Sequence, residues 1–224
     1  LSLLRIAELA SECGFPDGAL NIATGYGHEA GQALADAEGI DHISFTGSAR
    51  VGTIIAQSAA KRHVPVTLEL GGKSPQIVFA DANLDEAIPV IINAIVQNAG
   101  QTCSAGSRLL IEASAYERVL AAVGERMATL KVGPAAMDMD VGPLIRANQL
   151  DRVNGFLFDA KTANLRTIAQ GCIIADSPAS GFYAKPTLIA DVPATATLAQ
   201  DEVFGPVLAA MPFKDEADAI RLAN

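Results

Sequence analysis

The sequence predicts an α/β protein whose parallel sheet is sandwiched by helices. Two observations support this class. Short runs rich in β-branched and apolar residues, such as residues 42–46 and 64–70, alternate with longer segments of helical periodicity. Gly47 and Ser48 stand directly between one such run and the next helical segment, as expected where a strand leads into a helix. A strand–helix–strand rhythm of this kind is typical of parallel sheets.

Composition indicates a protein that buries much of its surface. Of the 224 residues, 50% are hydrophobic and only 18% are charged, against about 25% charged in an average protein. The chain is therefore expected to bury surface against partners, as in a homo-oligomer, or to be cut from something larger. The net charge of −9 argues against a nucleic-acid partner. The longest apolar run, residues 88–96, is too short to span a bilayer, so no membrane association is expected.

Cysteine and histidine usage points to a reducing compartment and no metal. The cysteines are odd in number and widely spaced, and there is neither a C-x-x-C motif nor a histidine cluster. We therefore expect no disulfide framework, no metal site and a cytoplasmic location. The chain has no signal-peptide pattern and no initiator methionine, and it stops inside a helical pattern, so both ends are expected to be cut.

The first part of the chain is expected to alternate helices with short strands. The boundaries come from apolar periodicity and from glycine-rich turns. In chain order, we predict a helix at 1–11, a strand at 19–23, a helix at 25–38, a strand at 42–46, a helix at 49–61 and a strand at 64–70.

The regular rhythm ends after Leu70, so we place a boundary there, between a part at 1–70 and a cysteine-bearing part at 71–224. Pro89 should kink its helix or mark a late start. The predicted elements of the second part are a buried strand at 76–80, a helix at 84–98, a strand at 108–112, helices at 116–130 and 149–160, a hairpin edge at 165–175, and strands at 182–189 and 207–213.

Two glycine-rich junctions could bind phosphate through backbone N–H groups at a helix start. Residues 25–31 have the spacing G-x-G-x-x-x-G, which is a weak signal, and a plain turn is at least as good an interpretation. Ser48 could hold a phosphate group, or it could simply cap the helix that follows.

A thiol, that of Cys103, and a carboxylate, that of Glu69, are the candidate nucleophile and general base of a catalytic site. Cys103 lies in a small, polar loop, outside any apolar stripe, so a reactive thiol is an open alternative there to the more usual buried, structural cysteine. Glu69 follows an apolar strand and is either exposed at the strand end or held in a crevice, where it would suit a general base. Cys13 and Cys172 are expected to be small buried hydrophobes. The three histidines are read as structural or surface residues, which disfavours a Cys–His hydrolase.

Five ordered motifs then make the chain resemble the NAD(P)-dependent aldehyde dehydrogenase superfamily from end to end. They are Phe-Thr-Gly-Ser at 45–48, Glu-Leu-Gly-Gly-Lys-Ser-Pro at 69–75, Gly-Gln-x-Cys-Ser-Ala-x-Ser-Arg at 100–108, Gly-Pro-Leu-Ile at 142–145 and Glu-Val-Phe-Gly-Pro at 202–206.

The resemblance implies a role for each member of the pair. Cys103 looks like the nucleophile that attacks the carbon of a small aldehyde, giving a thiohemiacetal and then a thioester. Glu69 looks like the base that activates water to hydrolyse that thioester.

The resemblance also implies a site for NAD or NADP. On the adenosine and pyrophosphate side, its residues would be Gly27, Gly31, Gly47 and Ser48. On the nicotinamide side, Glu202 would bind the ribose and Phe204 would lie beside the nicotinamide, with Gln149 at a ribose. Leu70 and Gly71, at the boundary between the two parts of the chain, would complete the site.

Members of this family are about twice as long as the chain. The segment before residue 1 would supply an oxyanion-hole Asn and an adenosine-side Lys, and the segment after residue 224 an oligomerisation strand. Losing one oxyanion donor costs roughly 10²–10³ in rate. We therefore expect the 224-residue chain alone to oxidise aldehydes negligibly, which a steady-state assay with NAD would test.

Two other interpretations stay open at this point. The chain could be a non-catalytic member that keeps the fold, in which case Cys103 would be alkylated no faster than the other cysteines. It could instead be a cofactor-independent, cysteine-dependent esterase using Cys103 and Glu69. The residues do not identify the aldehyde, or the choice between NAD and NADP.

Overall fold

The computed structural model describes residues 2–224. The chain divides into two compact units, one ending at Leu70 and the other beginning at Gly71. Each unit is described by itself below. The cofactor role expected of the first unit and the catalytic role expected of the second stay predictions.

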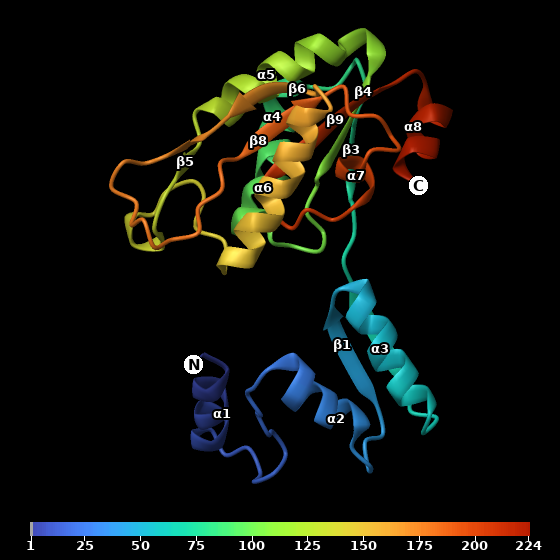
Figure 1. The fold of residues 1–224 in the computed structure, drawn as a ribbon, viewed down its shortest axis with the longest axis vertical. Coiled ribbons are helices and arrows are strands. Elements are labelled where there is room, and N and C mark those ends of the chain that lie inside the picture. The colour runs from blue at the N-terminus through green and yellow to red at the C-terminus, as the bar shows by residue number, and fades with distance from the viewer. Residues whose placement is uncertain (1) are drawn as a thin grey trace. The chain divides into compact units, whose positions relative to one another are not determined.

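The first unit pairs two parallel strands and packs a helix on them. Its elements, drawn in blue to cyan in Figure 1, are α1 (Ser2–Glu12), a π-helical turn (Gly27–Gly31), α2 (Gln32–Asp36), β1 (Ile43–Gly47), α3 (Ala49–Ala60) and β2 (Val66–Leu70). Gly52 brings α3 close to β2, since a methyl group added to it would lie 2.6 Å from Leu70 Cδ2. The strand–helix–strand unit expected from the sequence is therefore present.

The strand predicted at residues 19–23 is wrong. The backbone there is irregular. A strand needs a neighbour for its backbone hydrogen bonds, and among residues 2–70 only β1 and β2 pair with each other. The segment closes a local turn instead, where Asn21 Nδ2 donates to the Gly18 carbonyl oxygen at 2.8 Å.

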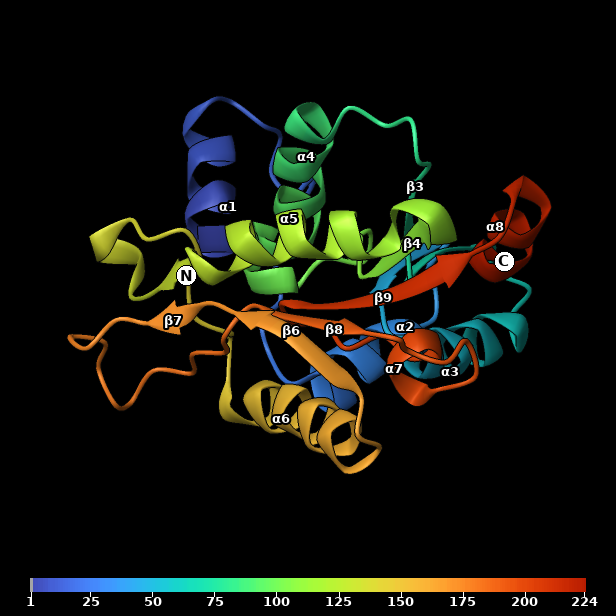
Figure 2. The same cartoon turned by 90° about the horizontal axis from the view of Figure 1, so that it is seen from above.

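The second unit is built on a five-stranded sheet of order β3-β4-β9-β8-β6. All neighbours are parallel except β6 and β8. Helices α4 and α5 cover one face and α6 lies on the other, as Figure 2 shows. The elements are β3 (Pro75–Val78), α4 (Leu84–Val96), β4 (Arg108–Glu112), α5 (Tyr116–Ala128), β5 (Lys131–Val132), α6 (Ala147–Thr162), β6 (Arg166–Gln170), β7 (Cys172–Ile173), β8 (Thr187–Ala190), α7 (Thr197–Gln200), β9 (Val207–Phe213) and α8 (Glu216–Ala223).

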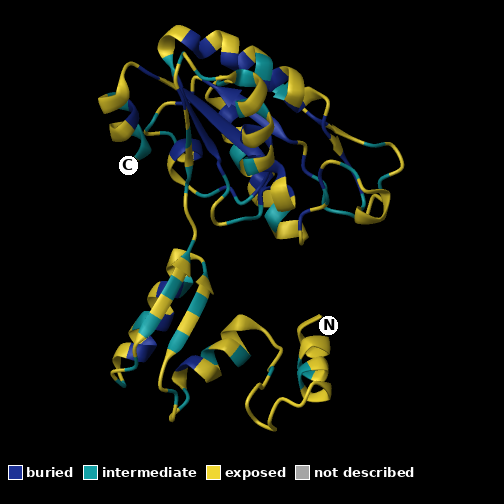
Figure 3. Ribbon diagram, turned by 180° about the vertical axis from the view of Figure 1, so that it is seen from behind, coloured by how far each residue is buried: buried dark blue, intermediate teal, exposed yellow. Residues whose placement is uncertain are grey.

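The hydrophobic core lies between this sheet and its helices. Leu109, Leu110 and Leu208, on the central strands, have no exposed surface. Figure 3 shows these strands in dark blue. Such burial on both faces is what a parallel sheet between two helical layers requires, and it confirms the fold class expected from the sequence.

The predicted hairpin at 165–175 is wrong, because the chain changes partner at Gly171. Strand β6 pairs with β8, whereas β7 pairs with β5. The Gly171 N–H donates to the Pro186 carbonyl at 2.9 Å, and the next N–H, that of Cys172, donates to the Leu130 carbonyl at 3.0 Å. A methyl group on Gly171 would lie 2.8 Å from that same Leu130 oxygen, so the crossing needs glycine.

Three other expectations also change. Strand β3 is at the sheet edge, so Ile77 and Phe79 are exposed instead of buried. Strand β8 begins at Thr187 and not at 182, directly after Pro186, which lacks an N–H to donate. Helix α4 begins at Leu84, before Pro89, so Pro89 does not mark a late start.

Candidate functional site

In the first unit, two of the sequence motifs meet at one sheet edge. The parallel register places Thr46 opposite Glu69 and Gly47 opposite Leu70. In open α/β sheets, ligands bind at the carboxyl ends of the strands, which is where these residues lie. Glu69 is exposed at the end of β2 within this unit, as in the strand-end alternative.

Ser48 caps helix α3, as one of its two interpretations predicted. Its hydroxyl oxygen accepts from the Val51 N–H at 3.4 Å, and its backbone is extended. The Phe45 ring lies against Gly47, so a methyl group there, 2.6 Å from Phe45 Cζ, would require the ring to move. Because the hydroxyl is exposed and its hydrogen bond is long, the cap leaves the phosphate interpretation open as a prediction.

In the glycine-rich turn at residues 25–31, packing does not explain Gly27 or Gly31. Gly27 and Gly31 lie in the π-helical turn, with no heavy atom within 4 Å of a methyl group added to either. Gly25 differs, because such a group would lie 2.7 Å from the Ala30 side chain. The cofactor role of Gly27 and Gly31 therefore stays a prediction from the resemblance.

In the second unit, the cysteine loop is reached through a tightly constrained turn. Asn98, Ala99 and Gly100 have φ values of 50°, 55° and 73°, in the left-handed region that costs a non-glycine residue energy. Asn98 Nδ2 donates to the Gln101 carbonyl and Gln101 Nε2 donates to the Asn98 carbonyl, both at 3.0 Å. A methyl group on Gly100 would lie 2.3 Å from the Gly205 carbonyl carbon, so the turn is locked against a second loop.

Cys103 lies in the exposed turn that follows, and its thiol is free. The Ala105 N–H donates to the Thr102 carbonyl at 3.1 Å, which closes the turn around it. Downstream, Gln76 Nε2 on β3 donates to the Gly106 carbonyl at 2.7 Å. The loop is thus held on both sides while the thiol itself stays accessible.

The Gly71–Gly72 backbone joins the cysteine loop to Glu202. A methyl group on Gly71 would lie 2.2 Å from Glu202 Oε2. The Gly72 N–H donates to Glu202 Oε1 at 3.4 Å, and a methyl group on Gly72 would lie 3.3 Å from the Cys103 carbonyl oxygen. A side chain at Gly71 would have to displace the Glu202 carboxylate, and one at Gly72 would require the cysteine loop to shift slightly.

Helix α6 holds the backbone of the loop that carries Glu202. Gln149 Nε2 donates to the carbonyls of Val203 at 3.0 Å and Phe204 at 2.8 Å. Arg152 donates to the Glu202 carbonyl. Both amide hydrogens of Gln149 are therefore used on the protein, so the ribose contact predicted for this residue would fall to its oxygen. Sequence reasoning did not find the role of Arg152, which has no local signal.

Two buried cations lie beneath this junction. The Arg108 guanidinium donates to the carbonyls of Lys73 at 2.8 Å, Leu222 at 2.8 Å and Ala223 at 2.6 Å. The Lys73 Nζ atom is buried and has no hydrogen-bond partner among residues 2–224. Burial, and then the Arg108 charge, lower the pKa of Lys73 to about 8. Both residues stand inside the quoted motifs, but sequence reasoning assigned neither a role.

The expectation that Cys13 and Cys172 are buried is wrong, since both are exposed. Cys13 follows α1, a helix that buries none of its residues, and Cys172 belongs to the two-residue strand β7. Exposure alone therefore does not distinguish Cys103. What distinguishes Cys103 from the other two cysteines is that its loop lies beside Gly72 and the Glu202 loop.

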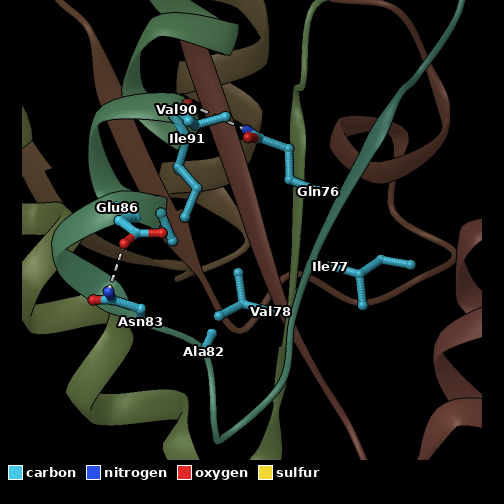
Figure 4. A pocket seen from close by; sticks show the side chains of 9 residues that line it. Gln76, Ile77, Val78, Ala82, Asn83, Glu86, Val90 and Ile91 are labelled. Carbon is cyan, nitrogen blue, oxygen red and sulfur yellow. Dashed lines mark hydrogen bonds between the residues drawn. The ribbon is translucent and has the colours of Figure 1, made fainter.

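A groove in the second unit does not include Cys103 in its lining, although it shares Gln76 with the contacts that hold the cysteine loop. It runs between β3 and α4 and is drawn in Figure 4, where Gln76 and Ile77 come from the strand and Asn83, Glu86 and Val90 from the helix side. Its lining is mainly apolar and carries no nucleophile, so it is not the site that the motifs define.

Two further findings concern residues 2–224. In this range no group of three or more His, Cys, Asp or Glu side chains is placed to hold a metal ion. Among the helices of the same range, none has both the length and the apolar character needed to cross a bilayer. Assembly as a homo-oligomer and a cytoplasmic location stay predictions.

Together, the parallel α/β fold and the meeting of the Cys103 loop and the Glu202 carboxylate at the Gly71–Gly72 backbone define an α/β protein with a candidate active site. Comparison with known proteins makes the class specific. The model of the aldehyde dehydrogenase family matches residues 1–224. The chain belongs to this family.

Individual relatives agree. An aldehyde dehydrogenase of Emericella nidulans is 43% identical over the whole chain, which covers 45% of that protein. A crystal structure of a provisionally named aldehyde dehydrogenase from Burkholderia cenocepacia is 61% identical, with a TM-score of 0.99, and the chain covers 47% of it. A Bacillus cereus aldehyde dehydrogenase solved as an NAD⁺ complex is 38% identical, with a TM-score of 0.94 and 45% coverage. The chain thus spans about half the length of the relatives it matches.

Proposed function

We propose that this chain carries the nucleophile of an NAD(P)-dependent aldehyde dehydrogenase that oxidises a small aldehyde to a carboxylic acid. One observation supports this most directly. Gly72 contacts the Glu202 carboxylate through its N–H and lies against the Cys103 carbonyl. The predicted nucleophile and the predicted ribose-binding acid are therefore held by the same short piece of backbone.

The proposed chemistry assigns bond changes to two residues. The Cys103 thiolate attacks the aldehyde carbon, so that an S–C bond forms and the carbonyl oxygen takes the electron pair. A bound nicotinamide would supply the hydride acceptor, and loss of the hydride from the former aldehyde carbon leaves Cys103 in a thioester. Glu69 takes a proton from water, the water oxygen attacks the thioester carbon, and the C–S bond breaks to release the acid and regenerate the thiolate.

The residues present fit a dinucleotide. Gly47 and Ser48 present backbone N–H groups and a hydroxyl at the start of α3, which suits a pyrophosphate. Glu202 presents two carboxylate oxygens, and among residues 2–224 only one of them accepts a hydrogen bond, a weak one, so both ribose hydroxyls have an acceptor. Phe204 follows on the same loop, held with φ at 56° by Gln149.

Substitutions at the two reacting positions test the proposal in the complete protein. Replacing Cys103 by Ala is expected to lower kcat for aldehyde oxidation by at least about 10³, since no other residue can form the thioester. Cys172→Ala, at another exposed cysteine, is the matched control and should keep wild-type turnover. Wild-type kcat in Cys103→Ala would overturn the proposal.

Replacing Glu69 by Gln is expected to act later in the reaction. Reduced nicotinamide should appear in a rapid burst of about one equivalent per site, followed by slow turnover limited by thioester hydrolysis. Stopped-flow absorbance measures both phases. A Glu69→Gln enzyme with an unchanged steady-state rate would remove Glu69 from the mechanism and leave the role of Cys103 intact.

A further inference from the structure

The turn that leads into the cysteine loop is strained, and the proposed mechanism gives no reason for the strain. Asn98 and Ala99 have φ values of 50° and 55°, in a region that residues with a β-carbon seldom adopt. Ala99 is buried in the core, and the next residue, Gly100, lies against the Gly205 backbone. Such a conformation persists only where the surrounding structure holds it, and such strain is often found at functional sites.

The Gln101 side chain holds this turn at its downstream end. Its Nε2 donates to the Asn98 carbonyl at 3.0 Å, and its backbone N–H donates to the same oxygen at 3.1 Å. Asn98 Nδ2 donates in return to the Gln101 carbonyl at 3.0 Å. These hydrogen bonds close the turn across Ala99 and Gly100.

The other end of the same amide reaches a different motif. Gln101 Oε1 accepts from the Ile145 N–H at 2.9 Å, a contact between residues 44 positions apart. Ile145 ends the Gly-Pro-Leu-Ile motif at 142–145, to which the proposed mechanism gives no role. That segment is itself anchored, because the Leu144 side chain is buried and its N–H donates to the Phe182 carbonyl at 2.7 Å. Gln101 therefore ties the strained turn to a fixed part of the second unit.

The thiol lies between this bridge and a second anchor. Downstream of Cys103, the Gly106 N–H donates to the Ala94 carbonyl of α4 at 2.9 Å, and the Gly106 carbonyl accepts from Gln76. Upstream, Gln101 is only two residues from Cys103. Because the downstream end is fixed, a change at the Gln101 bridge should be taken up by the short segment that carries the thiol.

We propose that Gln101 is a positioning residue: its amide bridges the strained turn at 98–100 and the Ile145 N–H, and so fixes where the Cys103 thiol stands. Nucleophilic attack depends steeply on placement, since a shift of about 1 Å can cost roughly a hundredfold in rate. This inference rests on the proposed function for the reaction that the thiol performs. The bridge itself belongs to the second unit and can be measured without any reaction.

The variant Gln101→Met tests the proposal in the complete protein, because Met has a similar length and lacks the amide. We expect kcat for aldehyde oxidation to fall at least about tenfold. The Kd for NAD, measured by calorimetry, should change by no more than about twofold, since Gln149 and Arg152 hold the Glu202 loop separately. Gln57→Met, at an exposed glutamine on α3, is the matched control and should change neither value. Wild-type kcat in Gln101→Met, or equal losses of kcat and NAD affinity, would overturn the proposal.

Hydrogen exchange measured by mass spectrometry gives a readout that does not depend on activity. In Gln101→Met, peptides covering 97–106 should exchange at least about tenfold faster, whereas peptides from β4 and β9 should keep their wild-type rates, because the bridge acts locally. Equal acceleration throughout the second unit would mean that Gln101 only stabilises the fold. That result, or no acceleration at 97–106, would refute the positioning role.

A second variant separates the two ends of the bridge. Gln101→Glu keeps an oxygen for the Ile145 N–H and loses only the donor to the Asn98 carbonyl. Exchange at 97–106 should be faster than in the wild type, by less than in Gln101→Met. Wild-type exchange in Gln101→Glu would overturn the proposal even if Gln101→Met failed to fold. If the wild type oxidises no aldehyde, the proposed function fails, and hydrogen exchange alone decides whether the bridge orders the cysteine loop.

Discussion

The two units of the chain both carry predicted site residues, but they support them differently. In residues 2–70 the buried apolar side chains are only Ala35, Ile55 and Ala59, and the sheet has two strands. In residues 71–224 a continuous core lies between a five-stranded sheet and its helices, as the colours of Figure 3 show.

This difference in packing determines how firmly each unit holds its predicted site residues. A two-stranded sheet is marginally stable on its own, so the first unit displays Ser48 and Glu69 at a sheet edge with little packing behind them. The second unit fixes Cys103 and Glu202 through its own backbone contacts. Substitutions at matched residue types in the two units should therefore have unequal effects.

Matched glycines should show the largest contrast. In Gly100→Ala the new methyl group would lie 2.3 Å from the Gly205 backbone, at a φ of +73°, and neither backbone can give way cheaply. We expect a loss of roughly 4 kcal/mol in the free energy of unfolding, or failure to fold. Gly31→Ala, in open space on a helical turn, should be neutral or stabilising by up to about 1 kcal/mol. Denaturant unfolding followed by circular dichroism measures both; equal losses would mean that the units do not differ in this way.

Matched isoleucines probe the cores. Ile111 lies on β4 with no exposed surface, and Ile55 lies on α3 with 8% of its surface exposed. Replacing Ile111 by Ala should lower the free energy of unfolding by about 3 kcal/mol, because a rigid core leaves a cavity. Ile55→Ala should cost about 1 kcal/mol, since the thinly packed first unit can collapse around the gap. A larger loss at Ile55, measured by the same unfolding experiment, would contradict the comparison.

Titrating groups should make stability rise with pH in both units, but in different windows, alkaline for Lys73 and acid for Asp36. The folded-state pKa of Lys73 is about 8 against an ordinary 10.5, so between these values the unfolded chain binds the extra proton. Stability should rise with pH across that window, by at most about 3 kcal/mol, and Lys73→Met should abolish the rise. Unfolding free energies measured from about pH 7 to 11 test this, and a rise of equal size in the variant would contradict it.

In the first unit, the side-chain hydrogen bond from Ser58 holds the pKa of Asp36 below its ordinary 3.8. Stability from this group is therefore present above pH 3.8 and is lost as pH falls through the folded-state pKa. Asp36→Asn is the acid-side counterpart of Lys73→Met and should flatten only the acid limb of the stability curve. Flattening of the alkaline limb instead would show that the two effects are not separate.

Much of the fold could be predicted because its signals are local. Strands at 108–112 and 207–213 were placed to the residue, since each is an apolar run ended by polar or turn-forming residues. The Ser48 cap follows from a hydroxyl placed directly before a helical stripe. The errors at 19–23 and 165–175 have one cause. A strand exists only where another strand pairs with it, and no window of sequence shows the partner.

The sequence by itself determined the family and the α/β class, because these follow from residue types in a fixed order, and it predicts Cys103 and Glu202 as members of a site. Tertiary structure alone decided how the parts of the second unit meet. It brought Gly72 against both Glu202 and the Cys103 loop. It also placed the Gln149 side-chain amide where it donates to two backbone carbonyls, and it buried the Lys73 ammonium. These contacts join residues up to 130 positions apart, and such proximity arises only when the core closes.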